Sequence, residues 1–201
     1  VGDTQMITVK ELSLPPVNVR EVLRYSGCDK AAPEVEMLLK ECVDEAREIF
    51  CGKVVYAEFP VNKTEGGIDL GFARTNSHDL AKNLDGCEHA VVFCATVGHG
   101  IDRLIRKYSV VSPAKAVVFQ GLGAERIEAL CDLFCAELEA NGLTTRPRFS
   151  PGYGDLSLAV QPPLLQALNA EKLLGITVSD TLLMSPTKSV TAFAGITNST
   201  E

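Results

Sequence analysis

The sequence lacks tryptophan altogether and has only three histidines among its 201 residues. It has no apolar run near the roughly 20 residues that a membrane-spanning helix needs, so we expect no membrane segment. A signal peptide is not expected either, because no basic segment followed by an apolar one occurs near the start. Lysine and arginine form no block and the net charge is −7, which disfavours nucleic-acid binding because that function needs a basic face.

Signatures of disulfides and metal sites are also absent. The seven cysteines are an odd number, form no C-x-x-C pair, and are not spaced with histidines as zinc ligands would be. They are scattered through apolar segments, which is typical of reduced thiols in a cytoplasmic protein. We therefore predict no structural metal.

What is present indicates an ordinary globular protein, with 46% hydrophobic and 22% charged residues. The length suffices for a real core, and we expect a single domain over residues 1–201. Residues 1–17 are interpreted as an extended lead-in, because Pro15 and Pro16 disfavour helix. Residues 1–5 could be an expression remnant ahead of a native start at Met6.

Hydrophobic periodicity predicts an α+β fold, with a long helix crossing grouped strands. Helices are expected at 18–25, 34–50, 77–84, 101–108, 112–138 and 164–168. Strands are expected at 53–61, 89–96, 176–178, 181–184 and 189–196, with a polar hairpin at 62–75. The continuous apolar run at 89–96 indicates a strand buried on both faces. The last two strands would form a terminal hairpin around Pro186.

Two glycines, Gly121 and Gly123, fall inside the predicted helix 112–138. Each weakens a helix by roughly 1 kcal/mol relative to alanine. They would let another element, or a ligand, approach the backbone closely. They are not a dinucleotide-binding fingerprint, because no strand and turn precede them.

The segment 146–155 (RPRFSPGYGD) is the most distinctive stretch of the chain. Its two prolines and two glycines cannot continue a helix. Arg148 on such a turning backbone is suited to bidentate capture of a carboxylate or phosphate. The alternative is a proline-rich connection with solvated arginines, which is the role we expect for Arg146.

Candidates for chemistry elsewhere are few. Glu125 and Glu128 lie on the small-residue part of the long helix, where a glutamate can pair with an ammonium group. Together with Arg148, such a glutamate would fit the zwitterionic end of an amino acid. His99 lies between two glycines, but no nucleophile elbow accompanies it, so it is interpreted as a turn residue.

Three segments in order resemble the activation domain of cobalamin-dependent methionine synthase, and the first hundred residues, including 21–25, resemble its short stand-alone members more than the fused domain. Arg148-x-x-Pro151-Gly152-Tyr153 resembles the family's ligand loop, and residues 116–130 resemble its long helix, with Glu128 at the position of a ligand-contacting glutamate. Residues 182–186 followed by Ser189-Val190-Thr191 are similar to its Met-x-Pro and Ser-Val-Ser strands. The similar region spans residues 112–196.

The resemblance implies a mostly antiparallel, twisted sheet crossed by a long helix, and a site for S-adenosylmethionine. Arg148 would hold the methionyl carboxylate, Glu128 a polar group of the ligand, and Tyr153 the corrin-facing, catalytic edge. The remaining contacts would come from the loop around Phe149, Ser150, Pro151 and Gly152.

The function implied is that of an accessory activation subunit within a cobalamin-dependent methyltransferase system. It would support reductive methylation of cob(II)alamin on a separate methionine synthase subunit, with an electron donor such as a flavodoxin-like protein. Two alternatives are a non-catalytic corrinoid-protein partner or scaffold that has lost S-adenosylmethionine binding, and an unrelated small-molecule binding domain.

The sequence also departs from the family pattern. Asp3 and Asp29 are the only nominal counterparts of the family's N-terminal aspartate contact. Gly154-Asp155-Leu156 stands where the family has Pro-Ala-Cys-Pro-Asp. These departures bear on ligand affinity rather than on the fold.

Overall fold

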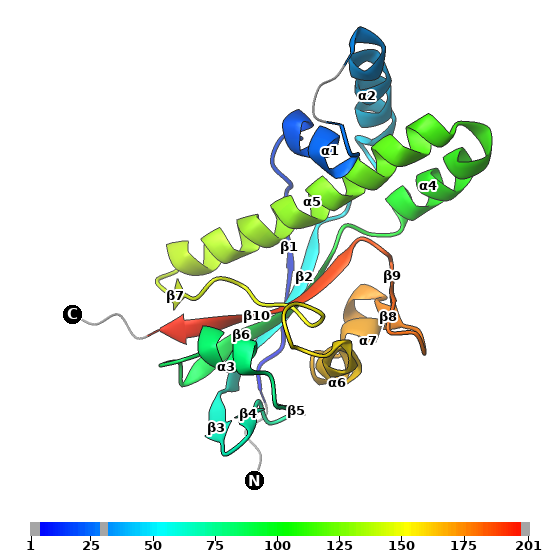
Figure 1. Cartoon of the computed structure of the whole chain (residues 1–201). Coiled ribbons are helices and arrows are strands. Elements are labelled where there is room, and N and C mark those ends of the chain that lie inside the picture. Colours follow the sequence, from blue (N-terminus) through cyan, green and yellow to red (C-terminus); the bar gives the residue numbers. More distant parts are fainter. Residues whose placement is uncertain (1–4, 29–31, 198–201) are drawn as a thin grey trace.

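The centre of the molecule is a five-stranded antiparallel sheet with strand order β1-β2-β6-β10-β7 (Figure 1). This computed structural model describes residues 5–28 and 32–197. The strands are β1 (Thr8–Glu11), β2 (Lys53–Pro60), β6 (His89–Thr96), β10 (Ser189–Thr197) and β7 (Thr144–Thr145). The strand β10, late in the sequence, lies between β6 and β7 and pairs with β6 over its length, with Phe193 opposite Val92.

Both faces of the sheet are covered, because side chains alternate along each strand. On β6, Val91, Phe93 and Ala95 belong to the core beneath the long helix. Their neighbours Val92 and Cys94 belong to a second core on the opposite face. The prediction of a strand buried on both faces is therefore confirmed.

One face is crossed by α5 (Pro113–Ala140), a single helix that continues through Gly121 and Gly123 as predicted (Figure 1). Phe134 of α5 packs against Phe93 and Tyr56 of the sheet, with ring centroids 5.0 Å apart in both pairs. The helices α1 (Val19–Tyr25), α2 (Pro33–Ala46) and α4 (Gly100–Val111) all contact α5.

The helix α2 ends four residues before the predicted end of the 34–50 helix. The chain turns at residues 47–49, where the amide of Ile49 bonds to the carbonyl of Ala46. Ile49 and Phe50 still pack against the core, but from a turn rather than from the helix. Because both residues are apolar and fit the helical spacing, the sequence pattern predicts a helix that continues past Ala46, where α2 ends.

The opposite face is covered by short elements, among them α3 (His78–Asn83), α6 (Gln161–Ala167) and α7 (Ala170–Leu174). Leu80, Leu164 and Leu168 from these segments are fully buried against Val92 and Phe193. The predicted polar hairpin at 62–75 is a small three-stranded sheet of β3 (Asn62–Thr64), β4 (Gly67–Asp69) and β5 (Arg74–Thr75).

The predicted terminal hairpin is wrong. The strand β9 (Met184–Ser185) pairs with β8 (Thr177–Val178), whereas β10 pairs with β6 and β7. Leu182 has a left-handed backbone (φ 62°) and Leu183 is 69% exposed, so most of residues 181–184 form a turn. Strand β6 has eight residues, seven of them buried, whereas β9 has two and neither is buried. Pairing with β6 therefore buries more apolar surface.

Across residues 5–28 and 32–197, every helix is too short or too polar to cross a lipid bilayer.

The close approach of α1 to α5 depends on Gly121. A Cβ atom at this position would lie 2.2 Å from Ser26 Oγ and 2.7 Å from the backbone oxygen of Val22. The prediction that a small residue here admits another element is therefore confirmed, and the element is α1.

We expect Gly121→Ala to destabilise the protein, although alanine favours helix by about 1 kcal/mol. The added methyl group forces α1 away from α5, and such overpacking costs about 1–3 kcal/mol. Urea unfolding measures the change in the free energy of unfolding. The control is Gly123→Ala, where the new methyl would meet the movable side chain of Lys188 first. Equal or greater stability of Gly121→Ala relative to that control would contradict the packing argument.

Candidate functional site

The loop at 146–155 is fixed to the sheet by backbone pairing. The amide of Phe149 bonds to the carbonyl of Phe193, and the amide of Phe193 bonds to the carbonyl of Phe149, both at 2.8 Å. The amide of Arg146 bonds to the carbonyl of Gly195. Residues 146–149 therefore lie along the edge of β10, and Arg148 is held beside that strand.

The turn that follows uses the conformational freedom of glycine. Gly152 (φ 88°) and Gly154 (φ 54°) have left-handed backbone conformations. Residues other than glycine rarely adopt this conformation. The amide of Gly152 bonds to the carbonyl of Leu156 at 2.7 Å and closes the turn.

Asp155 fastens the end of this loop to α3. Its carboxylate accepts hydrogen bonds from the Ser77 hydroxyl and from the amides of His78 (2.8 Å) and Asp79 (3.2 Å). These are amides at the N-terminus of a helix, where carboxylates bind favourably. Sequence reasoning noted Asp155 only as a departure from the family pattern.

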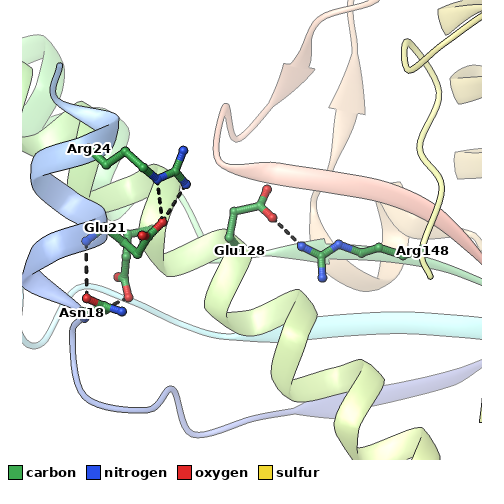
Figure 2. Close-up of polar contacts among 6 residues, drawn as sticks. Asn18, Glu21, Arg24, Glu128 and Arg148 are labelled. Atoms are coloured by element: carbon green, nitrogen blue, oxygen red, sulfur yellow. Dashed lines mark hydrogen bonds and ion pairs between the residues drawn. The ribbon is translucent and has the colours of Figure 1, made fainter.

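Arg148 reaches from the loop to α5 and pairs with two carboxylates. One guanidinium nitrogen bonds to Glu128 (Figure 2) and another bonds to Asp132. Burial alone would lower the pKa of Arg148, but the bond to Asp132 and the charge of Glu128 outweigh it, so the pKa is raised. Two negative charges face one positive charge here.

A pocket of about 500 Å³ opens beside this ion pair, a volume within the usual range for small-molecule sites. It brings together five of the predicted site residues, namely Glu128, Arg148, Ser150, Pro151 and Tyr153. Tyr153 is 70% exposed and stands edge-on to the ring of Phe149. Phe149 and Gly152 do not line the pocket: Phe149 packs into the core, and Gly152 shapes the turn.

The other pocket residues come from α6 and from the two strands at 184–191. They are Gln161, Met184, Ser189, Val190 and Thr191. Gln161 is 5% exposed and Thr191 is 2% exposed. Among the described residues, neither the amide oxygen of Gln161 nor the hydroxyl of Thr191 has a hydrogen-bond partner. An unsatisfied buried group costs about 1–3 kcal/mol, so these atoms fit a pocket built for a polar ligand.

On the other side of Glu128 lies a second pocket, of about 690 Å³, between α5 and α1. Asn18, Glu21 and Arg24 of the α1 region line it, and Figure 2 shows them facing Glu128 across a gap. No sequence motif indicates that these residues lie near the ligand loop. Asp3 and Asp29, the nominal N-terminal candidates, lie outside the described residues.

Glu125 does not line the pocket beside Arg148. It is 4% exposed, forms an ion pair with Arg126 at 2.5 Å, and accepts a bond from the amide of Asn18. Arg126 also donates to the carbonyls of Pro15 and Pro16. This buried pair fixes the lead-in segment to α5.

Thiol and histidine chemistry find no support at the site. Burial raises the pKa of the Cys131 and Cys135 thiols on α5, so neither thiolate forms near neutral pH. His99 is the residue that precedes α4 (Gly100–Val111), and it lines a separate pocket with Asp102 and Gln120.

A curled antiparallel sheet crossed by one long helix is the fold predicted from the motifs, that of a cobalamin-dependent synthase activation domain. A solved structure that shares it is the crystal structure of the MetH reactivation domain bound to AdoHcy. The TM-score is 0.70 with 14% sequence identity, over 98% of this chain and 80% of that one. No family model matches the sequence, and no curated protein does so either. The likeness confirms the predicted fold.

We expect the tie between Asp155 and α3 to make stability depend on acid pH. The hydrogen bond from Ser77 and the amides at 78 and 79 lower the pKa of Asp155. Its contribution to stability is therefore complete above the ordinary carboxyl pKa of about 4, and is lost as pH falls through the lower folded value. Asp155→Asn should lower the melting temperature at pH 7, and should lower it less at about pH 3, below the ordinary carboxyl pKa.

The measurement is a thermal melt of both proteins at the two pH values. At each pH, the melting temperature of Asp155→Asn is subtracted from that of the unaltered protein. The other carboxylates titrate alike in both proteins, so their effect cancels in this difference. An equal difference at both pH values would contradict the assigned role of Asp155.

Proposed function

We propose that this protein binds S-adenosylmethionine and serves as the activation module of a cobalamin-dependent methionine synthase carried on a separate chain. The observation that carries the proposal is the pocket beside Arg148 and Glu128, in which two opposite charges and two unpartnered polar groups converge. The fold shared with a reactivation domain that binds AdoHcy supports it.

The charges at the rim of the pocket suit the amino-acid end of the ligand. Asp132 is 71% exposed, so its ion pair with Arg148 contributes little to stability and is easily exchanged. A ligand carboxylate would take the place of Asp132 on the guanidinium, in a bidentate pairing. Glu128, on the other side of Arg148, would then face the ligand ammonium group.

Tyr153 is suited to the mouth of the site. Its ring is largely exposed, yet it is held edge-on by Phe149, with ring centroids 5.4 Å apart. An exposed, oriented aromatic ring can contact the flat face of a corrin and set the distance of the ligand from it. Gly152 and Phe149 would contribute by holding the loop, rather than by touching the ligand.

The chemistry asks the protein mainly for orientation. One electron from an external donor, such as a flavodoxin-like protein, and the methyl group of S-adenosylmethionine together convert cob(II)alamin to methylcobalamin, with release of S-adenosylhomocysteine. The sulfonium is already a good leaving group, so no general acid or base is required. This agrees with a pocket that contains no activated thiol and no histidine among its lining residues.

We place this activity in the cytoplasm. All seven cysteines lie within the described residues and all are free thiols. Thiols persist in reducing compartments. The proposal includes no membrane or nucleic-acid partner.

One observation favours a second candidate, a corrinoid-protein scaffold that has lost ligand binding. Arg148 already has two carboxylate partners, so its charge is satisfied without a ligand. The two candidates differ in whether Asp132 gives way to a ligand carboxylate.

We expect the purified protein to bind S-adenosylmethionine with micromolar affinity, measured by calorimetry. Arg148→Ala should weaken binding about 10- to 100-fold, because a charge-assisted bond contributes about 1.5–3 kcal/mol. Asp132→Asn should strengthen binding, because it removes the competing carboxylate. Arg146→Ala is the control, since that side chain does not line the pocket.

No heat with the unaltered protein, at ligand well above this range, would rule out the leading proposal and favour the scaffold. Unchanged affinity in Arg148→Ala would leave S-adenosylmethionine as a ligand but place it elsewhere.

We further expect reconstitution to require every component. A cobalamin-carrying partner in the cob(II)alamin state should regain its methylated absorption spectrum only when this protein, S-adenosylmethionine and a reductant are all present. Arg148→Ala in place of the unaltered protein should slow that recovery. Equal recovery without this chain would contradict an activating role.

A further inference from the structure

The floor of the pocket beside Arg148 holds two polar groups that the proposed charge contacts do not use. Gln161 begins α6 and Thr191 lies in β10, and these two elements pack against each other. Both side chains are more than nine-tenths buried and both line the pocket. Among the described residues, the Gln161 amide oxygen and the Thr191 hydroxyl have no hydrogen-bond partner.

A neighbouring hydroxyl in the same strand does have a hydrogen-bond partner within the protein. Ser189, two residues before Thr191 on the same face of β10, donates to the hydroxyl of Thr96 at 2.9 Å. By contrast, Thr191, which lines the pocket, has no hydrogen-bond partner for its hydroxyl among the described residues. Such groups are normally satisfied by protein, water or ligand.

The pocket is thus divided by charge. Its ionic groups, Glu128 and Arg148, extend from α5 and the ligand loop and are partly exposed. The groups on its floor, Gln161 and Thr191, are neutral and buried. A ligand with one charged end and one neutral, hydrogen-bonding end would satisfy both regions, whereas burying a charge on the neutral floor would be costly.

We infer that Gln161 and Thr191 form the subsite for the nucleoside half of the ligand, and hydrogen-bond its hydroxyl groups or base edge. An amide and a hydroxyl can each both donate and accept, which matches the mixed donors and acceptors of a nucleoside. The inference rests on the proposed function, because the ligand is taken to be S-adenosylmethionine or its product. The competing explanation is that bound water satisfies both groups and the ligand never reaches them.

Two ligands separate the halves of the molecule. S-Adenosylhomocysteine has both halves, whereas 5′-methylthioadenosine keeps the nucleoside and lacks the amino-acid end. We expect Gln161→Leu and Thr191→Val each to weaken both ligands by about tenfold, the effect of one lost hydrogen bond. Arg148→Lys should weaken S-adenosylhomocysteine selectively. The matched control is Gln166→Leu, the same replacement at an exposed position of α6.

Melting temperature is the second measurement. Because each replacement removes an unpartnered buried polar atom, both variants should melt at or above the temperature of the unaltered protein while binding less tightly. A purely structural role would lower the melting temperature instead.

Each result bears on the inference. Unaltered affinity of Gln161→Leu and Thr191→Val for both ligands would overturn it and leave the proposed function standing, with water as the partner. In Gln161→Leu or Thr191→Val, loss of S-adenosylhomocysteine binding with full retention of 5′-methylthioadenosine binding would also overturn it. If the unaltered protein binds neither ligand, the inference and the proposed function fail together.

Discussion

The ion pairs of Arg148 with Glu128 and Asp132 join the ligand loop to the long helix, and the geometry of the site depends on that join. The backbone of the loop is fixed to β10 at Phe149, and Arg148 ties the loop to α5 as well. Removing Arg148 would leave both carboxylates of α5 without their partner, whereas removing the exposed Asp132 leaves Arg148 paired with Glu128. On its other side, α5 holds the lead-in through Arg126, so one helix positions both walls around Glu128.

Much of the fold could be predicted because most of its elements carry local signals. Pro113 at a first helical turn and the periodic apolar residues after it defined α5, and the uninterrupted apolar run defined β6 as a doubly covered strand. The prediction of a terminal hairpin was wrong because local signals do not decide which strands pair. Nothing within residues 181–196 specifies whether β10 pairs with its neighbour or with a strand roughly one hundred residues earlier, because pairing is decided by the surface buried, a property of the whole chain.

Some residues of the candidate site could likewise be predicted from local sequence, and others could not. Arg148, Pro151 and Tyr153 form a compact motif, so their grouping is visible in the sequence. Gln161 and Thr191 carry no such signal, since a missing hydrogen-bond partner is a property of the folded neighbourhood. Glu125 is three residues from Glu128 and looks equivalent to it in sequence. In the structure, however, Glu125 pairs with the buried Arg126 and accepts a hydrogen bond from the amide of Asn18, at the end of the lead-in segment. Asp155 likewise gains its meaning only from the helix end that it meets.

The central place of β10 has a consequence for how the protein is made. During synthesis the ribosome completes β2 and β6 long before β10, and the apolar edge of β6 then has no strand beside it on that side. The loop bearing Arg148 likewise emerges before Phe193, its backbone partner. Until β10 emerges, this hydrophobic strand edge is free to associate with other chains, so aggregation competes with folding during that interval.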